Sequence, residues 1–239
     1  MAKNRAFVVA IAVLLVTVVP LTKADNIDCR TGPGCLNGTD FFDWGDNYGL
    51  SLSPVPNGSI ATSNGGVNAE VNFATGGNGL RADQGNGWTG NFSPGDELLL
   101  TENIFDGLTF NGPLSFLFDT ALSGVGANIQ TNFFGDFTAL LEAFDGGNTL
   151  IGSYSKPGNS TGDGDGSAIF IGLGNIPGIE SVIFSITACS EHCEGFAINQ
   201  LDIVLGDGGP APIPEPGTLL LLGTGLAGLA RFRKKKSAV

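Results

Sequence analysis

Short apolar segments with a period of two recur along the middle of this chain, and breaks rich in glycine, asparagine, aspartate and proline separate them. In one of them, Val67, Ala69, Val71 and Phe73 alternate with polar residues. A period of two places alternate side chains on opposite faces of a strand, and the frequent breaks favour tight turns. The 38 glycines and 12 prolines of the 239-residue chain supply these breaks. We therefore predict an all-β body at residues 25–208, folded as a single antiparallel β-sandwich or jelly-roll-like domain.

The expected strands follow the apolar segments. They are 67–73, 97–101, 114–118, 125–129, 137–144, 149–155, 168–173, 182–186, 196–198 and 201–205. The sequence Asp145 to Asn148 separates two of them closely enough to predict a hairpin. A change of phase at Asn199 and Gln200 predicts a β-bulge. The segment 137–144 suits a short helix as well as a strand.

Residues 1–24 have the features of a secretory signal peptide. Lys3 and Arg5 precede an apolar run at 6–19, and small residues precede a cut after Ala24. The run is short for a spanning helix, which needs ~20 apolar residues. A buried strand and a permanent anchor are the alternatives. A signal peptide implies export to an oxidising compartment.

The C-terminal segment has three consecutive parts. Residues 209–217 form a proline-rich spacer that contains Pro214, Glu215 and Pro216, and prolines favour an extended conformation. The apolar run 219–230 predicts a short transmembrane helix within residues 218–239. A basic cluster then holds the extreme C-terminus in the cytoplasm by the positive-inside rule. This cluster consists of Arg231, Arg233, Lys234, Lys235 and Lys236.

This tail resembles the PEP-CTERM sorting signal of exported bacterial proteins. The resemblance rests on Pro214-Glu215-Pro216, on the glycine-containing apolar run and on the basic cluster, in that order. It implies recognition by an exosortase, a membrane enzyme that cuts near the Pro-Glu-Pro motif and releases or transfers the body. The protein would be anchored transiently in the cytoplasmic (inner) membrane before it reaches the cell surface or extracellular matrix. A plain tail anchor is the alternative.

Part of the body resembles the β-sandwich bodies found upstream of such tails. The similar segments are residues 125–130, 142–145, 166–172 and 196–202. This resemblance concerns the pattern of residues within the strands. It therefore supports the fold and carries over no catalytic residue.

Four cysteines predict disulfides in an exported body. Cys29 and Cys35 would close one short loop, and Cys189 and Cys193 would close another, so local pairs are favoured. Four cysteines nevertheless allow three pairings. The alternative is a zinc site made by Cys189, His192 and Cys193 with a thiolate from the N-terminal pair.

Asp163 and Asp165 alternate with glycines in the loop 161–167. Carboxylates on such a loop are suitable oxygen ligands for calcium, although we expect the body to need no cofactor. The EF-hand pattern fails, because Ala168 and Gly174 occupy positions that require glycine and glutamate. The alternative is a solvated turn.

Trp44 and Trp88 lie in turn-like sequences, where exposed indoles can stack on sugar rings. This arrangement predicts a glycan-associated body, with exopolysaccharide as a partner. The alternative places both indoles in the core of the sandwich or at its ends.

Charge restricts the partners further. The whole chain has a net charge of −12, but residues 25–210 contain three bases, Arg30, Arg81 and Lys156, against 22 acids. The body therefore carries a net charge of −19. Such a body is not expected to bind nucleic acid, whose phosphates require clusters of Lys and Arg.

Motifs for catalysis are scarce. His192 is the single histidine, and G-x-S-x-G does not occur. Residues 223–228 satisfy G-x-G-x-x-G, but no acidic residue follows them, as a dinucleotide site would require. We expect a non-enzymatic surface or matrix protein. The alternative is a carbohydrate-active enzyme of the glycoside hydrolase type, which needs only two carboxylates at a set separation.

Overall fold

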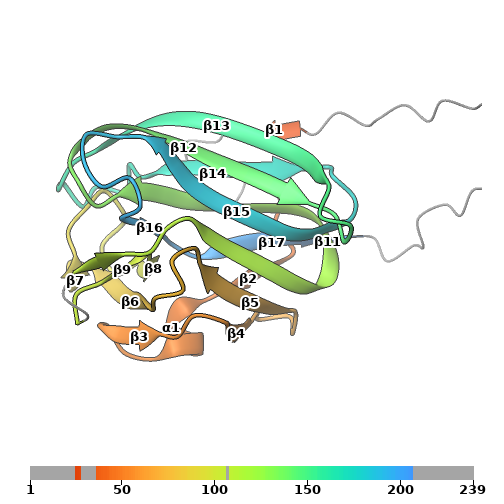
Figure 1. The fold of residues 1–239 in the computed structure, drawn as a ribbon, viewed down its shortest axis with the longest axis horizontal. Helices are drawn as coiled ribbons and strands as arrows, with labels where there is room; N and C mark the ends of the chain where they lie inside the picture. Colours follow the sequence, from red (N-terminus) through yellow and green to blue (C-terminus); the bar gives the residue numbers. More distant parts are fainter. Residues whose placement is uncertain (1–24, 28–35, 106–107, 207–239) are drawn as a thin grey trace, which may run out of the picture.

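The computed structural model describes residues 25–27, 36–105 and 108–206, which form two packed layers of strands (Figure 1). The first layer has the order β13-β12-β15-β11-β5-β4. Its strands are β13 (Leu150–Ser160), β12 (Gly135–Phe144), β15 (Ile179–Ala188), β11 (Leu114–Thr131), β5 (Asn68–Phe73) and β4 (Ser59–Thr62).

The second layer is built around the other half of β11. One edge of β11 pairs with β14, which pairs with β1, and the other edge pairs with β17 and β16. Strand β17 also pairs with β2. Strand β16 pairs with β8, β8 pairs with β6, and β6 pairs with both β3 and β7. These strands are β1 (Asp25–Ile27), β14 (Ile169–Gly174), β17 (Leu201–Leu205), β16 (Phe196–Ile198), β2 (Asp40–Phe42), β8 (Glu97–Leu100), β6 (Gly79–Gln84), β3 (Ser53–Val55) and β7 (Gly87–Trp88).

Strand β11 links the two layers because it changes layer at the exposed residues Asp119, Thr120 and Ala121. Residues 114–118 pair with β15 and β5, and residues 125–129 pair with β14. The sequence predicted two separate strands, 114–118 and 125–129, and the structure joins them into one strand of 18 residues. Almost all pairings are antiparallel, as predicted, and the parallel pair β6–β7 is short.

The main core lies between the layers and consists of the inward-facing residues of both. In β5 the buried residues are Ala69, Val71 and Phe73, which confirms the predicted alternation. In β12, Ala139 and Leu141 are buried on the same face, so the segment 137–144 is a strand and not the helix that also suited its sequence. The predicted hairpin also forms, because Asp145 N donates to Thr149 O at 3.0 Å between β12 and β13.

The second layer is covered on its outer face as well. A smaller core there contains Leu80, Trp88, Phe92, Leu98 and Ala197. Asn128 and Gln130 of β11 point to this side and are 9% and 1% exposed. The alternation of apolar and polar residues in this part of β11 is typical of a half-buried strand, but here the loops 88–93 and 161–168 cover the polar face as well.

The predicted bulge lies between β16 and β17. Ile198 pairs with Ile129 and Asp202 pairs with Gly126, so one extra residue is present opposite β11. Asn199 fills the gap, because its amide N donates to Asn128 O at 3.1 Å and its Oδ1 accepts from Asn128 N at 2.9 Å.

The remaining elements have little signal in the sequence. They include the helix α1 (Trp44–Tyr48), the strands β2, β3, β4, β6 and β7, and the small hairpin of β9 (Glu102–Asn103) and β10 (Thr109–Phe110). Each is short, so neither period can be read from it.

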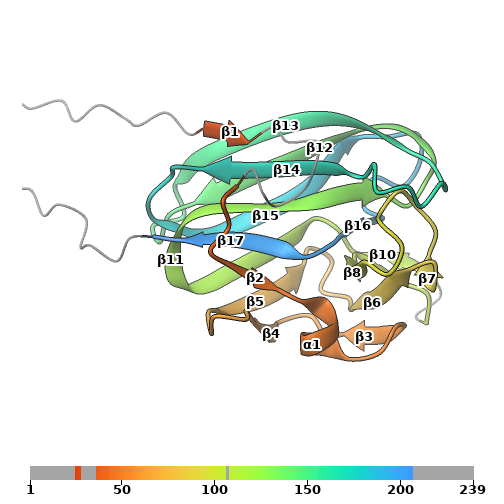
Figure 2. The ribbon, with the colours of Figure 1, turned by 180° about the vertical axis from the view of Figure 1, so that it is seen from behind.

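Strand β1 and the C-terminal end of β17 lie at the same end of the molecule, and the loops around β7, β8 and β10 lie at the opposite end (Figures 1 and 2). Within the described ranges, no helix is long and apolar enough to cross a bilayer. The predicted signal peptide, spacer, transmembrane helix and basic cluster fall outside those ranges.

Candidate functional site

The helix α1 positions the first residues of the candidate site. Asp43 caps its N-terminus, and Asp43 Oδ1 accepts hydrogen bonds from Gly45 N at 2.8 Å and Asp46 N at 3.1 Å. Gly49 ends the helix with a φ of 80°, which favours glycine. The sequence Asp43-Trp44-Gly45-Asp46 therefore starts a single helical turn, which brings Asp43 next to β8.

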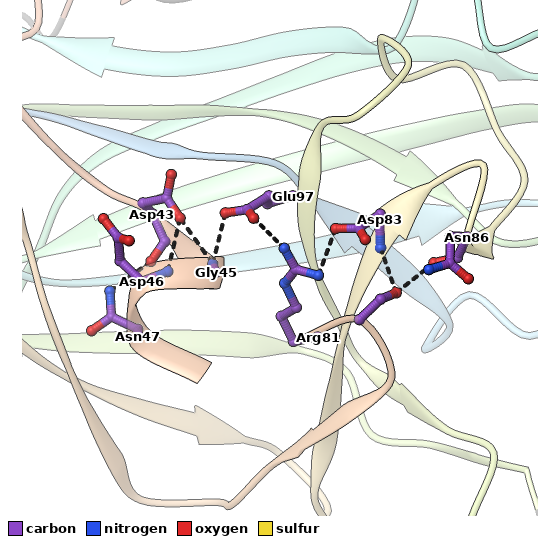
Figure 3. A network of polar contacts seen from close by, with 9 residues as sticks. Asp43, Gly45, Asp46, Asn47, Arg81, Asp83, Asn86 and Glu97 are labelled. Carbon is purple, nitrogen blue, oxygen red and sulfur yellow. Dashed lines mark hydrogen bonds and ion pairs between the residues drawn. The ribbon is translucent and has the colours of Figure 1, made fainter. Parts of the chain in front are cut away.

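A buried arginine connects this turn to β6 and β8 (Figure 3). Arg81 is 3% exposed and forms ion pairs with Asp83, at 2.5 Å, and with Glu97. Glu97 Oε2 in turn accepts from Gly45 N at 2.8 Å. The positive charge of Arg81 and the N-terminus of α1 thus hold the acids of this network in place.

A cleft of about 660 Å³ opens beside this network. Four acids line it, and Trp44 and Phe92 form part of its wall. The acids are Asp43, Asp96, Glu97 and Asp202, and the polar lining also includes Ser93, Asn128, Asn199 and Gln200. These residues are far apart in sequence and meet because the bulge at residues 199–200 lies next to α1, where Trp44 Nε1 donates to Asn199 O at 2.7 Å.

The cleft presents more hydrogen-bond acceptors than donors. The side-chain amide of Asn128 donates to Ala168 O at 2.7 Å, and that of Gln200 donates to Asp202 Oδ1 at 2.7 Å. One N–H of each of these amides is therefore engaged within the wall, whereas the four carboxyl groups have remaining lone pairs. A ligand that fits this wall must bring hydroxyl or ammonium donors.

The acids of the cleft have pKa values that are shifted in different directions. Desolvation raises the pKa of Asp96, and it raises the pKa of Asp202 to about 6. The hydrogen bond with Asp43, followed by burial, raises the pKa of Glu97. Burial also raises the pKa of Asp43, but hydrogen bonds from Glu97 and from the amides of Asp46 and Gly45 outweigh it, so the net shift is downward. Within this pair the pKa of Glu97 is therefore raised and the pKa of Asp43 is lowered.

The raised pKa of Asp202 predicts a pH-dependent stability. The folded state holds this proton more tightly than the unfolded state, whose pKa is near 3.8. The stabilisation is therefore complete below about pH 4 and is lost as the pH rises through about 6, a loss of about 3 kcal/mol. We expect Asp202→Asn to reduce this loss, as measured by urea unfolding at about pH 4 and about pH 7.

Asp119→Asn is the matched control for the loss of one charge. Hydrogen bonds from Asn68 lower the pKa of Asp119. The contribution of Asp119 to stability therefore depends on pH in the opposite sense to that of Asp202, and it is lost as the pH falls. If wild type and Asp202→Asn show the same loss of stability with rising pH, burial of Asp202 is not its cause.

Both tryptophans lie in the core, which was the alternative to sugar stacking. Trp44 is 0% exposed and stacks between Phe42 and Phe116, and Trp88 is 3% exposed and packs edge-on against Phe92. Neither indole has an open face for a sugar ring, so the structure corrects the stacking hypothesis at these two positions.

Asp163 and Asp165 lie in an exposed turn whose own groups bind them. Asp163 accepts from Thr161 Oγ1 at 2.8 Å, and Asp165 accepts from Ser167 N at 3.0 Å. The hydrogen bonds from Ser167 lower the pKa of Asp165. Within the described ranges, no group of three or more His, Cys, Asp or Glu residues is placed to hold a metal ion. The solvated turn therefore describes this loop better than a calcium site.

Cys189 and Cys193 form the predicted disulfide, with their Cα atoms 5.6 Å apart. Two of the three thiolates of the alternative zinc site are therefore consumed. His192 lies between them and stacks on Phe110 with 4.7 Å between ring centroids. Cys29 and Cys35 lie outside the described residues.

Sequence reasoning missed Arg81 as the centre of a network. The signal was present, because Arg81 is one of three bases in a very acidic body and lies between the apolar residues Leu80 and Ala82. A lone cation in an apolar strand indicates a buried ion pair.

Comparisons with known proteins give little information about the function of the body. No curated protein matches the sequence. Among solved structures, a DUF4465 family protein from Bacteroides caccae is 14% identical, with a TM-score of 0.32, over 70% of this chain and 93% of that chain. A glycosylation-associated protein (Gap123) complex from Streptococcus agalactiae is 12% identical, with a TM-score of 0.23, over 74% of this chain and 49% of that chain. These similarities are too low to inform on function.

The C-terminal segment gives a specific match. Residues 212–235 match the PEP-CTERM protein-sorting motif and contain the Pro-Glu-Pro sequence, the apolar run and most of the basic cluster. This motif implies export and transient anchoring in a membrane before processing by an exosortase. The chain thus carries a PEP-CTERM protein-sorting motif that marks it as an exported, exosortase-sorted protein.

Proposed function

We propose that the sorted body is a non-enzymatic component of the cell surface or extracellular matrix that binds a hydroxyl-rich polysaccharide in its acidic cleft. The observation that carries this proposal is the acceptor-rich wall of a cleft of about 660 Å³. Polysaccharides have many hydroxyl donors, which match carboxylate and carbonyl acceptors.

The charge of the body narrows the class of polysaccharide. The described residues include 19 acids and two bases. Arg81 is 3% exposed, and Lys156 is 9% exposed and donates through Nζ to Phe170 O at 3.0 Å. Both cations are buried, so the described surface repels anionic polymers at low salt. The proposed ligand is a neutral or amino polysaccharide.

The position of the cleft supports a role while the chain is still anchored. Strand β17 begins at the cleft, where Asp202 lies, and ends at Leu205, from which the chain continues towards the sorting motif. The ends of the described chain lie at one end of the molecule (Figure 2). The first residues of β17 thus help to build the cleft, and the sorting segment follows the last ones in sequence.

The acid pair of the cleft favours binding over hydrolysis. Glycoside hydrolases hold their two carboxyl groups about 5 Å or more apart, with the sugar between them. Asp43 and Glu97 are hydrogen-bonded to each other, and both also accept from Gly45 N. Arg81 holds Glu97 from the other side. This pair stabilises the start of α1 and leaves no room for a glycosidic bond.

A co-sedimentation experiment tests the proposal. Purified body is mixed with insoluble neutral glucan, with chitosan and with an anionic alginate gel at low salt. We expect retention on one of the first two and none on alginate, and Asp96→Ala in the cleft should weaken retention about tenfold. Asp163→Ala, which removes an exposed acid outside the cleft, should bind like wild type.

Two results would contradict this assignment. Equal retention of Asp96→Ala and wild type would place the polysaccharide elsewhere on the body. Release of new reducing ends by wild type, and not by Asp96→Ala, would establish the carbohydrate-active enzyme instead.

A further inference from the structure

Asn-Gly sequences occur six times in the chain, at 37–38, 57–58, 64–65, 78–79, 86–87 and 111–112. In such a pair the glycine nitrogen can attack the asparagine side-chain carbon, because glycine has no side chain to hinder the approach. Ring closure expels ammonia and leaves a succinimide, and water then opens the ring to aspartate or isoaspartate. Both reacting groups must be free to move, so the fold determines which pairs react.

Four of the pairs have a reacting group held in a hydrogen bond. These bonds run from Gly58 N to Val71 O at 2.8 Å, from Gly65 N to Asp40 Oδ1 at 2.7 Å, from Asn57 N to Asn78 Oδ1 at 3.2 Å and from Gly112 N to Glu194 O at 3.0 Å. Reaction at these pairs requires local opening of the structure first. The pair at 37–38 lies close to residues 28–35, which are outside the described ranges.

The pair Asn86–Gly87 differs from these four. The backbone of Asn86 is fixed, since its N donates to Asp83 O at 2.9 Å and its O accepts from Asp83 N at 3.0 Å and from Ser51 Oγ at 2.5 Å. Both Asn86 and Gly87 are exposed, and Asn86 lies at the edge of the network in Figure 3. Among the described residues, no hydrogen-bond partner is found for the side chain of Asn86.

The amide of Gly87 is also available. Gly87 pairs with Asp83 in the parallel pair β6–β7, and this pairing uses Asn86 O. In a parallel ladder the bonds on either side of a paired residue come from its neighbours, so Gly87 N points away from β6. Its φ of 98° is a conformation that glycine adopts without strain.

We propose that Asn86–Gly87 is a site of spontaneous deamidation in the folded body. The isoaspartate product carries one additional CH₂ in the backbone at residue 86, two residues before Trp88. Trp88 is 3% exposed in the smaller core, and its carbonyl accepts from Gly85 N at 2.9 Å. The longer backbone would pull this strand out of register and add a negative charge near Asp83. An exported protein that is not renewed would accumulate this change with age.

Peptide mass mapping of aged protein tests the proposal. The folded body is incubated in mildly alkaline buffer and digested with chymotrypsin, because it has too few Lys and Arg residues for trypsin. We expect Asn86 to convert at least about tenfold faster than Asn57, Asn64, Asn78 and Asn111, which corresponds to ~1.4 kcal/mol of local opening. In concentrated urea, the five rates should become similar.

Two variants separate the chemistry from general ageing. Asn86→Gln should remain unmodified and keep its melting temperature during incubation, whereas the wild type should lose melting temperature as the isoaspartate accumulates. In Asn64→Gln, Asn86 should deamidate at the same rate as in wild type. Intact Asn86 after conversion of any of the other four sites, or equal rates for Asn86 and those sites in the folded protein, would overturn the proposal.

Discussion

Replacement of Arg81 by methionine should destabilise the body by about 3 kcal/mol, although Arg81 does not line the cleft. Methionine keeps most of the apolar stem but leaves Asp83 and Glu97 without their cation. Glu97 then lies next to Asp43 with no positive side chain nearby. Urea unfolding at neutral pH measures the change in the free energy of unfolding.

The double variant Arg81→Met with Glu97→Gln provides the control. Removal of the nearest uncompensated carboxylate should recover part of the lost stability, because the buried charge and not the lost packing is the main cause. A loss below about 1 kcal/mol in Arg81→Met would show that water compensates Asp83 and Glu97 as well as the arginine does.

Replacement of Pro214, Glu215 and Pro216 by alanine should abolish processing and leave the full-length chain in the membrane fraction. These residues lie within the matched sorting motif, and three alanines favour a helix that would continue into the apolar run. The exported body should fold normally, since it ends before this segment. Immunoblots of membrane and surface fractions measure the ratio of full-length to processed chain.

The matched control is Pro210→Ala, which changes the same spacer outside the matched residues. It should be processed like wild type. Normal processing of the triple-alanine variant would mean that the enzyme does not read the Pro-Glu-Pro sequence.

The parts of the fold that could be predicted are those with long, regular alternation. Strands β5, β12 and β15 each bury one face against the main core, so apolar residues recur at every second position. The bulge at residues 199–200 was predictable for the same reason, because the apolar phase shifts by one residue there.

Other features depend on contacts that no local pattern records. Gln130 looks like a solvent-facing residue, but its side chain donates to Asn91 Oδ1 and Ser160 Oγ, both at 2.7 Å, beneath a covering loop. The loop's own residues, rather than β11, determine this burial. Trp44 was misleading in the same way, because a turn-like sequence was in fact a capped helical turn over the core.

The candidate site was the least predictable part. Its acids, Asp43, Asp96, Glu97 and Asp202, come from three segments that only the sheet topology brings together. By contrast, the sorting motif is contiguous and has a fixed order of parts, so it could be recognised from sequence alone and matches its family at residues 212–235.

Mass spectrometry of the mature protein from the cell surface tests the central claim most directly. The account predicts a chain that ends at or near Pro214-Glu215-Pro216 and contains no peptide from the apolar run or the basic cluster. It also predicts an N-terminus at Asp25 and a Cys189–Cys193 disulfide. A surface form that retains Arg231 to Lys236 would contradict sorting by an exosortase and would instead support a plain tail anchor.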